Sequence, residues 1–409
     1  MPTDLLYDPA RHEPLRPIPW DESQVLTAIE YIVADTEVRF TEDRYWSLHP
    51  LDRASGDDTD RLETSLYDGA CGVIWALRYL EGIGAATLSR RYAAELERLL
   101  ARNRAQRGEF SERDRGSLLI GETPIQMMSF EEAPTEELES TLASLITGNI
   151  EHPARELMWG SPGTLLAALF LYEHTGRQRW SDLFRLTAAK LWSQLEWSPQ
   201  HECFYWTQYL SGRQSAYLDA VHGFVGTALP LIRGRHLLEV EEWQAWERCI
   251  VNTVARTAYR AGAYANWRPQ LDPAIDSQKK LLQFCHGAPG FVVCLASLPN
   301  PALDNLLLAA GATIWSAGPL AKGSNLCHGT AGNGYALLKL FERTRDPVWL
   351  ERARSFAMHG IAQTQEAALR YGQLRYSLWT GDLGFAVYLW DCLRAEAQFP
   401  TLDVLYAYP

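Results

Sequence analysis

The 409-residue chain has no apolar run long enough to cross a membrane, which takes roughly 18 residues in succession. Its first twenty residues contain prolines and charges of both signs, where a secretory signal peptide would have an apolar stretch. We therefore expect no membrane span and a cytoplasmic location.

Positive charge is also scarce. The chain has 38 Lys and Arg against 50 Asp and Glu, a formal net charge of −12. Nucleic acids and anionic membranes are bound by clustered Lys and Arg, so neither is expected as the main partner. The overall charge does not exclude a local basic pocket.

Cysteine is infrequent, and the number of cysteines is odd. The seven are Cys71, Cys203, Cys249, Cys285, Cys294, Cys327 and Cys392. An odd number scattered along a cytosolic chain does not indicate a disulfide framework. Reduced thiols are expected, most of them as small buried apolar side chains.

What the sequence has is a repeated motif, G-x-x-G followed by an apolar run of helix length. Clear copies include "YDGACGVIWALRYL", "WGSPGTLLAALFLY", "VHGFVGTALPLI" and "WTGDLGFAVYLW", while "LIGETPIQMM" has Pro124 in place of its second glycine. Successive copies lie 39 to 64 residues apart, which is enough for a helical hairpin with loops. The first glycines of the seven copies are Gly69, Gly121, Gly160, Gly223, Gly287, Gly329 and Gly381.

The segments between the motifs have apolar residues at three- and four-residue spacing, as amphipathic helices do. The runs after the motifs are apolar nearly all round, which indicates helices buried on both sides. Seven such pairs predict an all-α fold, an α/α toroid of seven inner and seven outer helices. We expect residues 61–409 to form this single domain, with residues 1–60 as a helical and loop extension that packs on the ring and includes the acidic run "SGDDTD".

The glycines suit the start of each inner helix, because without a side chain the backbone can turn sharply and neighbouring helices can approach closely. All inner helices would then begin at the same end of the ring. Their positive dipole ends would meet there and favour thiolates and other anions. The chemistry is therefore expected at this end.

We call each G-x-x-G motif, with the few residues before it, a junction. Three junctions carry residues that can bind metals: His222, the pair Cys285-His286 and the pair Cys327-His328. Two thiolates and one imidazole with an open fourth position would make a zinc site of the catalytic kind. Taken alone, Cys327-His328 could equally be a nucleophile with its base, or the packed start of a helix. The residue pattern leaves these alternatives open.

Other residues near the junctions have a structural and a functional interpretation. Lys322 lies five residues before Cys327 and is either a solvated loop lysine or a cation beside the site. Glu156 lies four residues before Gly160 and is either an exposed carboxylate or a catalytic one. Cys71 is most simply explained by packing.

The sequences "QFCHGAPG" and "GSNLCHGTAGNGYALLKL", with "VHGFVG" and the terminal "LWTGDLGFAVYLWDCL", resemble the lanthionine synthetase C-like family. The resemblance implies an α/α toroid around a central zinc ion, with Cys285, Cys327 and His328 as its ligands. It makes His222 an acid/base residue, and Lys322 matches a lysine of the eukaryotic-type members that bind glutathione.

The same resemblance relates Glu156 to a carboxylate before the third motif and makes His286 a non-ligand. Phe284 is a departure, because tryptophan is usual before the first ligand cysteine. The implied reaction is zinc-dependent addition of a thiol, from glutathione or a peptide cysteine, to dehydroalanine or dehydrobutyrine in a peptide or protein.

Two alternatives belong to other classes. A non-catalytic, zinc-stabilised protein that binds glutathione or a peptide would have the same ligands. A carbohydrate-active toroid would use paired carboxylates, but the thiols and imidazoles, and not the acids, gather at the junctions.

Overall fold

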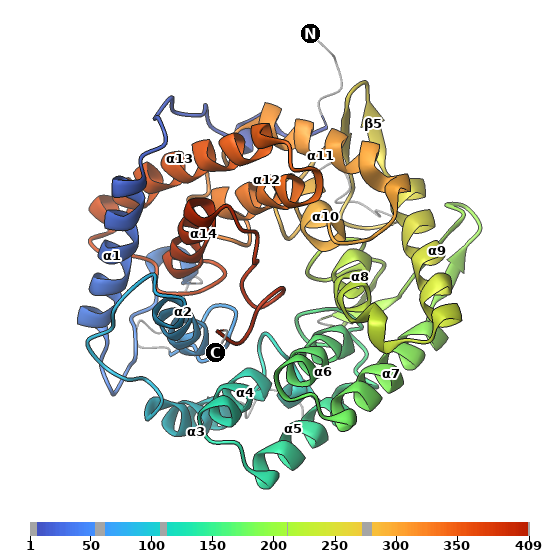
Figure 1. The fold of residues 1–409 in the computed structure, drawn as a ribbon, viewed down its shortest axis with the longest axis horizontal. Coiled ribbons are helices and arrows are strands. Elements are labelled where there is room, and N and C mark those ends of the chain that lie inside the picture. The colour runs from blue at the N-terminus through green and yellow to red at the C-terminus, as the bar shows by residue number, and fades with distance from the viewer. Residues whose placement is uncertain (1–5, 54–61, 107–112, 211, 272–279, 408–409) are drawn as a thin grey trace.

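The computed structural model describes residues 6–53, 62–106, 113–210, 212–271 and 280–407. Within these residues the chain is mostly helical, and its helices form two concentric rings (Figure 1). The predicted all-α toroid is confirmed. None of the described helices is both long and apolar enough to span a membrane.

The inner ring is made of the even-numbered helices, each of which contacts the next, and α14 contacts α2 to close the circle (Figure 1). These are α2 (Ala70–Gly82), α4 (Thr123–Glu132), α6 (Ser161–Thr175), α8 (Phe224–Arg233), α10 (Ala288–Leu295), α12 (Thr330–Thr344) and α14 (Asp382–Arg394). Nearly all their residues are buried, as expected for helices packed on both sides.

The outer ring is made of the odd-numbered helices, which wrap around the inner ones (Figure 1). They are α1 (Glu22–Arg39), α3 (Glu95–Gln106), α5 (Glu136–Asn149), α7 (Gln178–Ser193), α9 (Val240–Thr257), α11 (Asp304–Ala317) and α13 (Pro347–Tyr371). Their charged faces point outward and their apolar faces pack on the inner ring.

Helix α1 comes from the N-terminal segment that precedes the repeats, yet it takes a place in the outer ring. It packs on α14 and also contacts α13, so helices from the two ends of the chain lie side by side (Figure 1). The domain boundary at residue 60 stays a prediction. The acidic run "SGDDTD" lies outside the described residues.

Three short β-hairpins project from the loops between α7 and α8 and between α9 and α10. They pair β1 (Glu196–Ser198) with β2 (Cys203–Tyr205), β3 (Gln208–Leu210) with β4 (Arg213–Ser215), and β5 (Tyr259–Ala261) with β6 (Tyr264–Asn266). Short 3₁₀ turns lie at Pro9–Arg11, Pro50–Asp52, Asp114–Gly116, Gly234–Leu237 and Pro301–Leu303.

The junctions before the inner helices are tied to one another by backbone hydrogen bonds. The N–H of Cys285 donates to the carbonyl of Cys327 at 3.0 Å, and the N–H of Cys327 donates to the carbonyl of Trp379 at 2.8 Å. The N–H of Trp379 in turn donates to the carbonyl of Tyr67 at 3.0 Å, which joins the last junction to the first. Residues far apart in sequence therefore meet at one end of the ring.

The second glycine of a motif packs against the residues that precede its own helix and, in several copies, a neighbouring one, and Gly332 in α12 is an example. A Cβ atom on Gly332 would lie 2.9 Å from the Cβ of Phe284 in the adjacent junction and would overlap the carbonyl oxygen of Leu326. Neither contact is with the flexible end of a side chain. An added carbon can therefore be accommodated only if the backbone moves.

Gly332→Ala should therefore lower the free energy of unfolding by about 1–3 kcal/mol, the usual cost of overpacking. Gly148→Ala is the matched control, because Gly148 is also helical but has no atom within 4 Å of the added Cβ. That substitution should be neutral or slightly stabilising. Urea denaturation of both variants checks the prediction, and equal midpoints would contradict it.

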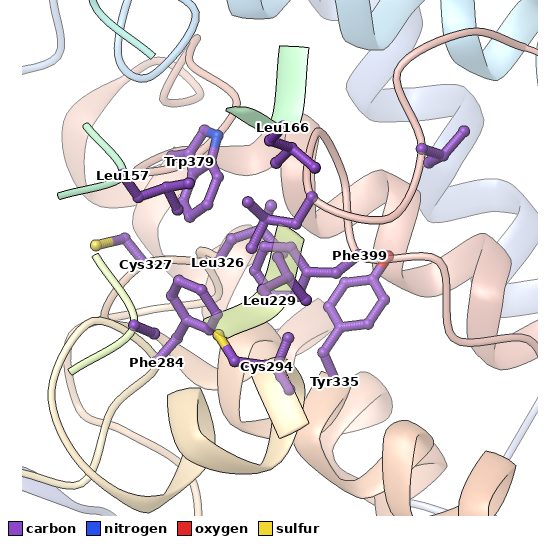
Figure 2. Packing of buried hydrophobic residues seen from close by; sticks show 14 of the residues in the cluster. Leu157, Leu166, Leu229, Phe284, Cys294, Leu326, Cys327, Tyr335, Trp379 and Phe399 are labelled. Atoms are coloured by element: carbon purple, nitrogen blue, oxygen red, sulfur yellow. The ribbon is translucent and has the colours of Figure 1, made fainter. Parts of the chain in front are cut away.

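The C-terminal segment turns back into the middle of the inner ring (Figure 1). Its Phe399 stacks on Phe284 with ring centroids 4.5 Å apart and also contacts Trp379 and Tyr335. Figure 2 shows these rings with Leu326 beside Cys327. Phe284 and Leu326, the residues before Cys285 and Cys327, thus belong to one buried apolar cluster. The backbone next to each cysteine is therefore anchored by packing.

Candidate functional site

Cys285 and Cys327 lie side by side at the junction end of the ring. Each is three residues before its helix, α10 or α12, and both are buried. Their thiols are within hydrogen-bonding reach of each other. The backbone hydrogen bond between the same two residues holds the pair in register. The structure thus brings together two thiols that are 42 residues apart in the sequence.

The two thiols differ in acidity because one shares its proton with the other. The hydrogen bond from Cys285 lowers the pKa of Cys327, and the hydroxyl of Tyr67, 2.8 Å from the Cys327 sulfur, acts in the same direction. The same hydrogen bond and burial raise the pKa of Cys285. Of the two thiols, Cys327 is therefore the first to lose its proton, while Cys285 keeps its own.

His328, the residue after Cys327, and Lys322 line a cavity of about 460 Å³. His328 is half-buried and Lys322 is exposed. Burial, together with the positive charges of Arg375 and Lys322, lowers the pKa of His328 to about 4. Its imidazole is therefore neutral at neutral pH, which is the form that can bind a metal.

The donor types fit zinc: two buried thiols, one of them with a lowered pKa, and a neutral imidazole on the adjacent residue. However, among the residues that the structure describes, no three His, Cys, Asp or Glu side chains converge closely enough to hold a metal ion. The two thiols are together, whereas the ring of His328 faces the cavity. The three-residue ligand set stays a prediction.

His222 and Glu156 form an ion pair next to these junctions. Nδ1 of His222 lies 2.9 Å from Oε2 of Glu156, whose side chain is fully buried. The same carboxylate accepts the backbone N–H groups of Met158 and Trp159 at 2.9 and 2.6 Å. Glu156 is therefore not an exposed helix-end carboxylate but a buried group that orients the imidazole.

The ion pair changes the acidity of His222. Burial alone lowers its pKa, but the hydrogen bond and charge of Glu156, with the charge of Asp219, outweigh this and raise the pKa to about 9. Cys285 is close enough to contribute to the same rise. At neutral pH His222 is thus a protonated imidazole with its Nδ1–H held by Glu156.

A second pair, Asp219 with His286, was not found by sequence reasoning. Oδ2 of the fully buried Asp219 lies 2.7 Å from Nδ1 of His286, and Oδ1 accepts the backbone N–H of His222 at 2.8 Å. The centroids of the His222 and His286 rings are 6.5 Å apart, and the ring of Tyr217 lies near both. His286, which directly follows Cys285, is thus paired with Asp219.

A regular feature of the sequence could have revealed Asp219. The residue four before the first glycine is polar in every copy of the motif, and several of these side chains accept N–H groups of their own turn. The positions are Ser65, Ser117, Glu156, Asp219, Gln283, Asn325 and Ser377. Acids occur at this position only in the third and fourth copies, which are the ones beside His222.

A sequence model of the family described as "Lanthionine synthetase C-like protein" matches residues 60–404. The match covers well over half of the chain and every junction. This chain belongs to the lanthionine synthetase C-like family. The resemblance seen in the cysteine motifs is thus confirmed.

Two eukaryotic relatives of this lanthionine synthetase C-like chain are informative. "Glutathione S-transferase LANCL1" of Danio rerio is 31% identical over 198 residues, which are 47% of this chain and 47% of that protein. "LanC-like protein GCL1" of Arabidopsis thaliana is 28% identical over 263 residues, which are 61% and 58% of the two chains. The chain thus spans about half the length of the curated relatives it matches.

Proposed function

We propose that this protein adds a thiol, from glutathione or a peptide cysteine, to dehydroalanine or dehydrobutyrine residues and so forms a thioether. The observation that carries the proposal is the pair of thiols, Cys285 and Cys327, beside a protonated His222 held by a buried carboxylate. This addition needs metal ligands that favour zinc, to activate the thiol, and a general acid, to protonate the product.

Cys285, Cys327 and His328 would hold a zinc ion with one position left for the substrate. When bound, zinc lowers the pKa of a coordinated thiol, which is otherwise about 8.5, and so supplies a thiolate at neutral pH. The buried surroundings of both cysteines keep water from competing at the site.

His222 would act as the acid of the reaction. The substrate sulfur bonds to the β-carbon of the dehydroamino acid, and the electron pair of the double bond moves towards the α-carbon and its carbonyl. A proton from the imidazolium of His222 then completes the α-carbon. The proton lost by the thiol equals the proton gained there, so the addition is balanced without any redox step.

Lys322 would bind negative charge at the cavity that it lines together with His328. It carries no hydrogen bond or ion pair of its side chain to any described residue. The cavity that it lines has charges of both signs: Arg370 and Arg375, and Glu13, Glu366 and Asp382. An ammonium at this position can stabilise the enolate or hold a substrate carboxylate. Glutathione has a thiol and a carboxylate that such an ammonium can bind, and the name of the zebrafish relative supports this donor.

The direct test incubates zinc-loaded protein with glutathione and a dehydroalanine peptide and measures the peptide mass. The expected product is the peptide with one glutathione attached, formed much faster than with zinc-stripped protein. No adduct above the uncatalysed rate would overturn the proposed reaction with glutathione. Binding of glutathione without adduct would instead favour the non-catalytic binding protein.

Glu156→Gln should change the pH dependence of the addition. Removing the carboxylate charge lowers the pKa of His222 from about 9 towards the ordinary histidine value near 6.5. The acid form is then lost at lower pH, so the rate of the variant relative to the native protein should fall as pH rises from about 6.5 to 9.

The measurement is kcat/KM across this range. Using the ratio of the two proteins removes the titration of the substrate thiol, which affects both equally. Glu151→Gln is the control, because Glu151 is exposed and pairs only with Lys190 among the described residues. A ratio independent of pH would contradict the role of Glu156.

A further inference from the structure

Each sulfur of the cysteine pair accepts a hydrogen bond from a neutral side chain of the protein. Nε2 of Gln283 lies 2.9 Å from the sulfur of Cys285, and the hydroxyl of Tyr67 lies 2.8 Å from the sulfur of Cys327. Gln283 is buried and Tyr67 is half-buried. Neither residue belongs to the proposed ligand set or contacts His222.

Gln283 occupies the position four residues before the first glycine of its motif, but in the described structure its side chain accepts no backbone N–H of its own turn and instead donates to the Cys285 sulfur. The turn is closed by backbone alone, since Gln283 and His286 exchange N–H to carbonyl hydrogen bonds at 3.0 and 3.1 Å. At the corresponding position Asp219 and Asn325 accept N–H groups of their own turns. The amide of Gln283 is thus free to reach the sulfur.

Arg11 decides which way the amide of Gln283 faces. Nη2 of Arg11 donates to Oε1 of Gln283 at 3.0 Å. A guanidinium can only donate, so the amide oxygen must face Arg11 and the NH₂ group must face the sulfur of Cys285. Arg11 is held in turn by its backbone carbonyl, which accepts the N–H of Ala321 at 3.0 Å.

Tyr67 is held in the first junction, where the ring of inner helices closes between α14 and α2. Its carbonyl accepts the N–H of Trp379, its N–H donates to the carbonyl of Leu119, and its ring lies against the Trp379 ring at 5.6 Å. These contacts come from the second and seventh junctions. The phenol therefore has little freedom to turn away from Cys327.

We infer that Gln283 and Tyr67 are positioning residues that orient the two cysteine sulfurs for metal binding, with Arg11 acting through Gln283. The inference rests on the proposed zinc site. Hydrogen bonds to metal-bound sulfur fix its orientation, and loss of such an outer contact typically weakens metal binding 10- to 100-fold. The N-terminal segment would then contribute to a site built otherwise from the repeats.

The test uses full-length Tyr67→Phe and Gln283→Leu proteins. Zinc affinity is measured by competition with a chromophoric chelator at one pH, and the sulfur-to-metal absorption bands are recorded with Co²⁺ in place of zinc. We expect each variant to bind zinc about 10-fold or more weakly and to shift these bands. Tyr92→Phe is the control, because Tyr92 is buried and its hydroxyl has no partner among the described residues.

Arg11→Met separates orientation of the amide from general packing. It should weaken zinc binding in the native background and have no further effect when combined with Gln283→Leu, because the two residues act as one unit. Arg11 is only partly buried, so this variant also tests the inference if Gln283→Leu does not fold.

The outcomes separate the two proposals. If the native protein binds zinc and every variant binds it equally well with unchanged cobalt bands, this inference is overturned while the zinc site stands. If the native protein binds no zinc, both the zinc site and this inference are overturned. An additive effect of Arg11→Met and Gln283→Leu would remove Arg11 from the inference.

Discussion

Cys327→Ala and Cys285→Ala should each remove the bound zinc and reduce thiol addition to the uncatalysed rate. Each substitution takes away one of three proposed ligands, and the two thiols lie together in a buried site. The remaining thiol and one imidazole cannot hold zinc in a site that normally takes four ligands. Metal analysis of the purified variants, with the peptide mass assay, checks both effects.

Cys71→Ala is the matched control for the two ligand substitutions. Cys71 is also a buried cysteine at the start of an inner helix, α2, but it is not among the residues that act on the acidity of the thiol pair. Burial raises the pKa of its thiol, so it is a protonated, apolar side chain. It should keep full zinc occupancy. Full occupancy in both Cys285→Ala and Cys327→Ala would show that the ligand assignment is wrong.

His222→Asn should slow addition strongly without releasing zinc. The imidazole is held by Glu156 and is protonated at neutral pH, so its loss removes the acid but none of the proposed ligands. General acid catalysis contributes about 10²- to 10⁴-fold, and the rate should fall by a factor in this range. The measurements are single-turnover addition rates and zinc content of the same preparation.

His152→Asn is the control for this substitution. His152 also pairs with a carboxylate, Asp114, at 2.9 Å, and it is buried. It is not among the residues that act on the acidity of the cysteine pair. The control should keep both zinc and rate. Loss of zinc in His222→Asn would instead make His222 a structural residue of the metal site.

The architecture could be predicted because its signal is local and repeated. Each G-x-x-G copy with its apolar run specifies one inner helix, and the amphipathic segment between copies specifies an outer one. Gly332 shows the physical reason for the motif, since any side chain there would overlap a neighbouring junction. A helix of the N-terminal extension packed on the ring was expected, but its membership of the outer ring was not, because no motif precedes it. It completes the outer ring by packing on α14.

The cysteine pair was also predictable, because Cys285 and Cys327 occupy equivalent positions in successive repeats. The surroundings of the pair were not. Glu156 could be read as an exposed residue from its sequence position, whereas it is fully buried against His222. Asp219 lies in a motif without a cysteine, and only the fold shows that its carboxylate reaches His286, 67 residues away.

By itself the sequence determined the toroid, the family and the meeting of two thiols at one end of the ring, since all three follow from residue types repeated at equivalent positions. Only the tertiary structure decided which side chains contact the sulfurs. Tyr67 is 260 residues from Cys327, and Arg11 is 272 residues from Gln283. Such hydrogen bonds depend on distance and orientation, which closure of the ring sets.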